Sequence, residues 1–313
     1  MQAERRFRAM GTDVHVIVHG DPDLAALAEA EVLRLERRWS RFLDDSEVSE
    51  LNRRAGEWVD VSPDTILLVE RAILAANATD GRFDPTVLGD VLRAGYDRSF
   101  EQVLAADPDR EVRTATLGRG VDHLDVDAAA GRVRLAAGTG FDPGGIGKGL
   151  AADLAAARVD AEGAAGVLVN IGGDLRAVGI GPDGDDWTVA LDPAASGHPF
   201  ATVVLDHGAL ATSTVRRRRW ELGGAAQHHL IDPATGRPST SEVASASVLA
   251  AHGWQAEALA KAALLAGLDE GLALIERLGA DGVLIDHDGT LHATARFDRF
   301  LVPAPSLLEG ALS

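Results

Sequence analysis

The feature that most constrains this chain is a glycine-rich stretch at residues 141–153, FDPGGIGKGLAAD. Its first part, Asp142-Pro143-Gly144-Gly145, predicts a turn, because proline fixes φ and glycine reaches backbone angles that other residues avoid. Lys148 follows between two glycines. The alanine-rich apolar run at residues 150–159 then predicts a helix.

A glycine turn, a lysine and a helix start together favour a site for an anionic group. Amide groups at a helix N-terminus point outward, the helix dipole attracts negative charge, and the ammonium of Lys148 adds a full positive charge. The GxxxxGK[ST] spacing of a P-loop is missing, and no GxGxxG run opens the helix. Taken alone, the stretch fits either a phosphate or nucleotide site or a glycine-rich connector.

Composition narrows the class of protein. The 313 residues, 46% hydrophobic and 25% charged, indicate a globular chain of one large domain or two ordinary ones. A net charge of −18 argues against a nucleic-acid-binding surface, which needs clustered cations. The absence of cysteine excludes disulfides and thiolate metal sites. The N-terminus lacks the apolar segment of a secretion signal, and no run approaches the roughly 18 apolar residues of a membrane span, so we expect a cytoplasmic protein.

Hydrophobic periodicity predicts helices and strands in alternation. Helices are expected at residues 24–39, 62–79 and 254–267, with short ones at 46–52 and near 100–106. Strands are expected at residues 7–18, 121–126, 133–137, 166–171, 187–191, 200–205 and 244–251, with a closing hairpin at 279–287 and 290–295. Several neighbouring strands look antiparallel, so the expected fold is α+β or mixed α/β. We expect a single domain of two lobes that spans residues 1–313.

Several polar and aromatic residues have both a structural and a functional reading. Phe42 stands before the short helix capped by Ser46, and packing in the core is the favoured reading. Asp84 lies in a loop directly after a helix, where a carboxylate forms a turn cap or serves as a ligand. The double histidine His228-His229 is more often packing than catalysis, yet it is the best general-base candidate by residue type.

Glu257 and Lys261 lie four residues apart on the helix expected at residues 254–267. Without further information, they read as a surface ion pair worth about 0.3 kcal/mol.

Short blocks distributed along the chain carry a resemblance to a known family. They are Met10-Gly11-Thr12, Ser46-Glu47 through Leu51-Asn52, Gly81-Arg82-Phe83-Asp84-Pro85-Thr86, Phe141-Asp142-Pro143-Gly144-Gly145-Ile146-Gly147-Lys148-Gly149, Asn170-Ile171-Gly172-Gly173-Asp174, Ala211-Thr212-Ser213, and His229-Leu230-Ile231-Asp232-Pro233 with Thr235-Gly236-Arg237-Pro238. In this order, over nearly the whole length, the chain resembles the ApbE family, the FAD:protein FMN transferases. Each block is weak alone, and the ordered set is specific.

The resemblance implies a T-fold-like architecture that binds FAD in a cleft between two lobes. It also implies a reaction in which FMN passes from FAD to a threonine hydroxyl of a target flavoprotein and AMP leaves, with Mg²⁺ as the usual cofactor. Two alternatives stay open. One is a catalytically weakened FAD-binding protein, and the other is a pyrophosphatase that hydrolyses FAD to FMN and AMP.

The resemblance also assigns roles to particular residues. Met10 and Phe42 would contact the flavin or adenine rings, and Arg82, Phe83 and Asp84 would line the cleft. Lys148 and Ser213 would lie beside the cofactor, and the carbonyl of Ala151 would face the metal. His229 would assist proton transfer.

The chain departs from the family pattern at the metal. Relatives usually carry an aspartate and a threonine that bind Mg²⁺ one turn apart, where this chain has Glu257 and Lys261. Glu257 can bind a hard cation, but a charged lysine has no acceptor. We hypothesise that the Lys261 ammonium partly replaces the metal charge, which leaves Mg²⁺ binding in doubt. The family's Ser-Gly also becomes Ser213-Thr214, and the arginines at residues 216–219 either contact phosphates or form a solvated strand edge.

Overall fold

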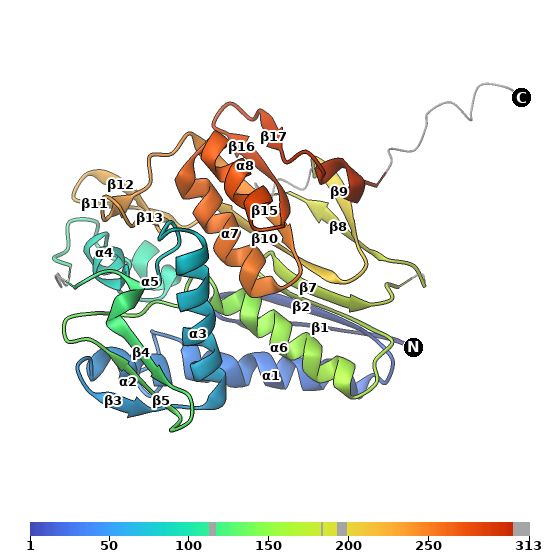
Figure 1. Ribbon diagram of the computed structural model, residues 1–313, viewed down its shortest axis with the longest axis horizontal. Helices are drawn as coiled ribbons and strands as arrows, with labels where there is room; N and C mark the ends of the chain where they lie inside the picture. Colours follow the sequence, from blue (N-terminus) through green and yellow to red (C-terminus); the bar gives the residue numbers. More distant parts are fainter. Residues whose placement is uncertain (113–116, 183, 193–198, 303–313) are drawn as a thin grey trace, which may run out of the picture.

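The computed structural model describes residues 1–112, 117–182, 184–192 and 199–302 (Figure 1). Its centre is an eight-stranded sheet in the order β1-β2-β6-β7-β10-β15-β16-β17, in which all neighbours are antiparallel. The strands are β1 (Gln2–Ala9), β2 (Thr12–His19), β6 (Gly166–Ile171), β7 (Asp174–Gly179), β10 (Gly208–Thr214), β15 (Val243–Ala250), β16 (Asp281–Asp286) and β17 (Leu291–Ala293). Helices beside an antiparallel sheet confirm the expected α+β class.

The two faces of the sheet are covered differently. Helices pack on one face: α1 (Asp23–Trp39), α6 (Gly147–Ala161), α7 (Gly253–Ala266) and α8 (Leu268–Arg277) (Figure 1). The other face carries the hairpin of β8 (Trp187–Leu191) and β9 (Ala201–Leu205). Strand β6 lies between the layers, with Val167 and Val169 in the core under the helices and Leu168 in the core under the hairpin. Burial on both faces explains its continuous apolar run.

Most of the remaining elements gather at one end of the molecule, beside the helix layer (Figure 1). They comprise α2 (Glu47–Arg53), α3 (Pro63–Ala78), α4 (Leu88–Arg93), α5 (Phe100–Leu104) and the small sheet of β3 (Trp58–Asp60), β5 (Arg132–Leu135) and β4 (Leu124–Asp127). Two short hairpins complete them: β11 (Arg219–Leu222) with β12 (Ala225–His228), and β13 (Ile231–Asp232) with β14 (Arg237–Pro238). Within the described residues, no helix combines the length and the apolar character needed to cross a membrane.

Local sequence signals predicted most boundaries but not all. The caps are confirmed, since the hydroxyls of Ser46 and Ser62 accept hydrogen bonds from the amides of residues 49 and 65. The strand expected at 121–126 is wrong in its first half, because Val121–His123 forms a 3₁₀ turn. There the amide of His123 donates to the carbonyl of Gly120, so it is not available to a neighbouring strand. Helices α4 and α8 were not predicted.

Helices α6 and α7 touch backbone to backbone where both begin. A Cβ added to Gly149 would lie 2.2 Å from the carbonyl oxygen of Gly253, so neither position has room for a side chain. Each helix also caps the other: Glu257 Oε2 accepts from the amide of Gly149 at 2.8 Å, and Asp153 accepts from the amides of Gly253 and Trp254 at 2.8 and 3.1 Å. Close approach and reciprocal capping fix the crossing of the two helices.

Replacing Gly149 by alanine should therefore destabilise the protein by about 1–3 kcal/mol or more, because the added methyl group overlaps rigid backbone. Gly147→Ala is the matched control in the same helical turn, since its Cβ would lie 3.4 Å from the nearest atom, the Cβ of Pro143. Urea denaturation of both variants checks this. Equal free energies of unfolding for the two variants would contradict the close crossing.

Candidate active site

The glycine-rich loop is held rigidly before α6. Asn52 on α2 binds Phe141 at both backbone groups, with its amide nitrogen donating to the carbonyl at 2.9 Å and its oxygen accepting from the amide at 2.7 Å. Asp142 Oδ1 then accepts from the amide of Gly144 at 2.9 Å, which closes a side-chain turn. The predicted turn is confirmed, and the block containing Asn52 serves to position it.

Two cavities open on either side of this loop. The polar cavity, of about 260 Å³, is lined by strand ends and their turns, including Asn170, Asp174, Thr212 and Ser213. The apolar cavity, of about 400 Å³, has charged and polar residues in its wall as well as an apolar group formed by Met10, Trp39, Phe42, Leu43, Phe83, Val87, Val91, Tyr96 and Phe100. The residues that line both cavities, here called the junction, are Gly11, Gly144, Lys148, Arg218, His229 and Lys261. The junction thus contains cations but no carboxylate.

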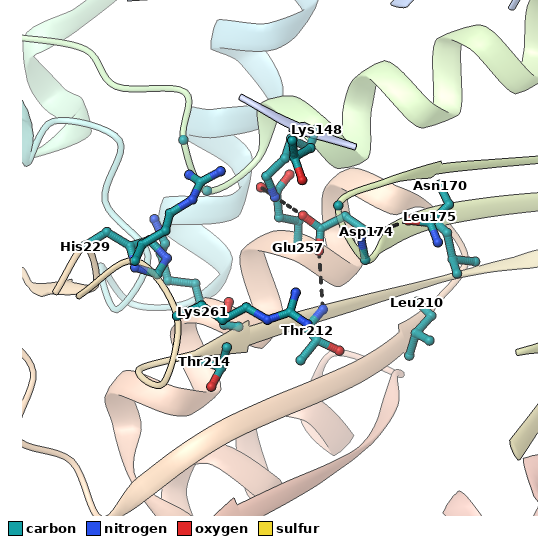
Figure 2. Close-up of a pocket in the computed structure, with 18 of the residues that line it drawn as sticks. Lys148, Asn170, Asp174, Leu175, Leu210, Thr212, Thr214, His229, Glu257 and Lys261 are labelled. Carbon is teal, nitrogen blue, oxygen red and sulfur yellow. Dashed lines mark hydrogen bonds and ion pairs between the residues drawn. The ribbon is translucent and has the colours of Figure 1, made fainter. Parts of the chain in front are cut away.

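Lys148 lies in the first turn of α6, which begins at Gly147, three residues before the predicted start at residue 150. Its ammonium donates to Asp174 Oδ2 and, at 2.9 Å, to Glu257 Oε1 (Figure 2). The expectation that free helix amides receive an anion is wrong at Gly149, because Glu257 already accepts from that amide. Any anion at the junction would therefore be attracted mainly by side chains.

Lys261 lies one turn after Glu257 on α7 and reaches the junction (Figure 2). The surface-pair reading is wrong, because Glu257 is only 4% exposed and binds Lys148 instead. Burial lowers the pKa of Lys261, while the carboxylates of Asp142 and Glu257 oppose that shift. Its ammonium packs against Gly145, where an added Cβ would lie 2.4 Å from Nζ. Lys148 and Lys261 are the only lysines of the chain.

The arginines at residues 216–219 divide between two sides of one turn. Arg218 adopts a φ of 48°, in the left-handed region, and its guanidinium donates to the Tyr96 hydroxyl at 3.4 Å and to the Gly11 carbonyl at 3.5 Å. Arg217 lines the polar cavity, whereas Arg219 faces away from both cavities and lines a third. Neither sequence-based alternative describes the whole run.

His229 is the only histidine at the junction, and its imidazole is the candidate general base. Burial lowers its pKa well below 6.5, and the nearby Arg218, Lys261 and Lys148 lower it further, so the imidazole is neutral at pH 7. Its Nδ1 is buried and has no hydrogen-bond partner. A neutral imidazole beside cations has the protonation state that a base requires.

Aromatic residues shape the apolar cavity. Phe42 is 40% exposed, so the reading as ordinary core is wrong. Its ring lies 5.8 Å from that of Tyr96, and the Arg41 guanidinium lies over it at 4.1 Å. Met10 and Gly11 have φ angles of 52° and 67° and form the two-residue turn between β1 and β2, which places Met10 in the cavity wall.

Arg82, Phe83 and Asp84 all line the apolar cavity. Phe83 is nearly enclosed, at 1% exposure. Asp84 Oδ1 accepts from the amide of Thr86 at 2.7 Å and from its hydroxyl, so the turn reading holds together with the position in the cavity wall. Ala151 lines neither cavity and is fully buried in α6.

The side chains at Glu257, Asp174 and Lys261 do not form a binding site for a divalent cation. Both oxygens of Glu257 and both of Asp174 already accept hydrogen bonds, from Lys148, the Gly149 amide and the Thr212 amide. Lys261 offers only donors when charged. Among the described residues, no group of three acidic or histidine side chains gathers at one point. The Mg²⁺ ligands implied by the resemblance are thus not assembled here.

Some site residues were not singled out from the sequence. Asp174 anchors Lys148, and Tyr96 binds Arg218 in the apolar cavity wall. Asp174 follows the paired glycines of a hairpin turn, which was a usable signal. Tyr96 carried none, because it lies between two short helices without a motif.

Comparisons with known proteins agree with this geometry. A sequence model of the ApbE family matches residues 10–284. The chain is 33% identical to an FAD:protein FMN transferase of Treponema pallidum, over 87% of this chain and 80% of the relative. It is 28% identical to one of Vibrio cholerae, over 85% and 82%.

Solved structures are similar over almost the whole chain. The ApbE protein of Thermotoga maritima superposes with a TM-score of 0.84 at 29% identity, covering 96% of this chain and 99% of that one. The flavin transferase ApbE of Vibrio cholerae superposes with a TM-score of 0.80 at 26% identity, covering 96% and 99%. The family model matches most of the chain, and three of the ordered sequence blocks contribute residues to the junction, so the chain belongs to the ApbE family.

Proposed function

We propose that this protein is an FAD:protein FMN transferase, which moves FMN from FAD to a threonine hydroxyl of an acceptor flavoprotein and releases AMP. Relatives named for this activity support the proposal. The observation that carries it is the junction, where Lys148, Lys261 and Arg218 meet the neutral His229 between an apolar and a polar cavity.

The shape of the site suits a dinucleotide. FAD has two ring systems joined by an anionic pyrophosphate, and the junction presents cations between two cavities. Phe42, Tyr96 and Met10 offer one ring system an apolar, aromatic wall. Asn170, Thr212 and Ser213 offer polar contacts on the other side. The pyrophosphate then lies against the ammonium and guanidinium groups.

The reaction is a substitution at phosphorus. The acceptor hydroxyl oxygen forms a bond to the phosphorus on the riboflavin side, and the bond from that phosphorus to the bridging oxygen breaks. The bridging oxygen leaves with AMP. His229 takes the hydroxyl proton as the new bond forms, which its neutral state allows.

Charge stabilisation falls to the side chains. Negative charge grows on the phosphoryl and bridging oxygens, and preorganised cations stabilise it. Lys148 is held by Asp174 and Glu257, whereas no hydrogen bond or ion pair of the Lys261 side chain is found among the described residues. We assign to Lys261 the charge that the family resemblance assigns to Mg²⁺.

A transfer assay tests the function. The purified protein is incubated with FAD and a flavoprotein acceptor produced without covalent flavin, in the presence of Mg²⁺ or of EDTA. Covalent FMN on the acceptor with stoichiometric AMP is expected in both conditions, because the Lys261 ammonium supplies positive charge that chelation does not remove. Free FMN and AMP without labelled acceptor would indicate a hydrolase, and intact bound FAD a binding protein. Loss of transfer in EDTA, or stoichiometric Mg²⁺ binding by calorimetry, would overturn the assignment to Lys261.

His229→Ala should lower kcat on the order of 10²-fold while FAD still binds, because a general base is lost. The control is His207→Ala, an exposed histidine in the turn between β9 and β10. Because the pKa of His229 lies well below 6.5, loss of the base should not lower the wild-type kcat/KM for FAD between about pH 8 and pH 6.5, and the acidic fall should begin only at lower pH. An acidic limb centred above pH 7 would contradict this role.

The pKa of Lys261 in the free protein should lie below 10.5, and it should rise when FAD binds, since phosphate charge favours the ammonium. Lysine labelled with ¹⁵N at Nζ gives only two side-chain signals in this chain, so NMR can follow both. Lys261→Met, which keeps the apolar stem, should lower kcat by about 10²-fold. A Lys261 signal that FAD leaves unchanged would contradict contact with the pyrophosphate.

A further inference from the structure

A third cavity lies against the β11–β12 hairpin and shares no lining residue with the junction. It has a volume of about 400 Å³ and is lined by Arg219, His228, Arg237, Ser239, Ser241 and His287, among others. No carboxylate is among its lining residues. We call it the arginine cavity.

The charge of the arginine cavity is unusual for this chain. The protein carries −18 overall, yet no hydrogen bond or ion pair of the Arg219 or Arg237 guanidinium is found among the described residues. His228 adds no charge, since its Nδ1 accepts from the Leu230 amide at 3.3 Å and its Nε2 donates to the Ser239 carbonyl at 3.0 Å. Two guanidinium groups without carboxylate partners therefore face the cavity.

The hairpin joins this cavity to the junction. Two pairs of consecutive residues divide between the two sites. Arg218 and His229 line the junction, whereas their neighbours Arg219 and His228 line the arginine cavity. Arg219 and His228 are paired across β11 and β12. Consecutive Cα atoms are about 3.8 Å apart, so the backbone positions that carry His228 and His229 are direct neighbours in the walls of the two sites.

We propose that the arginine cavity binds an acidic segment of the acceptor flavoprotein and so directs the acceptor hydroxyl to His229. This inference rests on the proposed transferase function. The two cavities at the junction are assigned to FAD, so the acceptor must be recognised elsewhere and close by. A chain with this net charge repels acidic partners generally, and the unpaired guanidiniums create a local exception that carboxylates can bind in two-point contacts.

The test compares Arg219→Glu/Arg237→Glu with the wild type in the transfer assay. The acceptor KM should rise about tenfold or more and lose its dependence on NaCl, because the attraction is electrostatic. The FAD dissociation constant, and any FAD turnover without acceptor, should stay unchanged. Arg158→Glu/Arg277→Glu, which reverses two exposed arginines on α6 and α8, is the charge-matched control. Arg219→Gln/Arg237→Gln, which removes charge without reversing it, should show a smaller effect of the same kind, and circular dichroism confirms folding.

A hexaglutamate peptide provides a direct probe. It should inhibit wild-type transfer in competition with the acceptor and leave the double variant unaffected. An unchanged acceptor KM in the variants, or inhibition by inorganic phosphate but not by the peptide, would overturn the docking site while leaving the transferase function intact. A wild-type protein that labels no acceptor would instead contradict the transferase function itself, and with it this inference.

Discussion

The site depends on the crossing of α6 and α7, whose first turns meet through Gly149 and Gly253 with no side chain between them. Each helix supplies a carboxylate that caps the N-terminus of the other, Glu257 for α6 and Asp153 for α7. Because the crossing is so close, the chain's only lysines, one on each helix, reach the same junction. The capping also uses the helix amide at Gly149, so side chains supply the positive charge that faces the cavities.

Strand turns supply the other half of the site. The turn between β1 and β2 lies beside the turn between β6 and β7, where a Cβ added to Gly172 would lie 2.4 Å from the Thr12 hydroxyl. This contact brings Gly11 to the junction and Asp174 to Lys148 (Figure 2). The sheet thus acts as a rigid base that fixes loop residues distant in sequence, as is common for binding sites built on strand ends.

Much of this was predictable from local signals. The caps at Ser46 and Ser62, the buried strand β6 and the glycine turn follow from rules that act within a few residues. The exposure of Phe42 and the burial of Glu257 could not be predicted in this way, because each depends on contacts with distant segments. Their spacing in the sequence predicted that Glu257 and Lys261 form a surface ion pair. In the folded protein, Glu257 binds Lys148 instead, and Lys261 faces the cavities. The ordered blocks identified the family, but not how their residues pair.

We propose that side-chain cations take the place of a metal at the phosphates. A lysine at position 261 cannot act as a metal ligand when charged, and the nearby carboxylates of Asp174 and Glu257 are committed to hydrogen bonds. The most direct measurement is a crystal structure of the protein with FAD bound. The account predicts the pyrophosphate in contact with the Lys148 and Lys261 ammonium groups, with a ring system in the apolar cavity. A pyrophosphate bound away from both lysines, or held by a metal ion on Glu257, would contradict it.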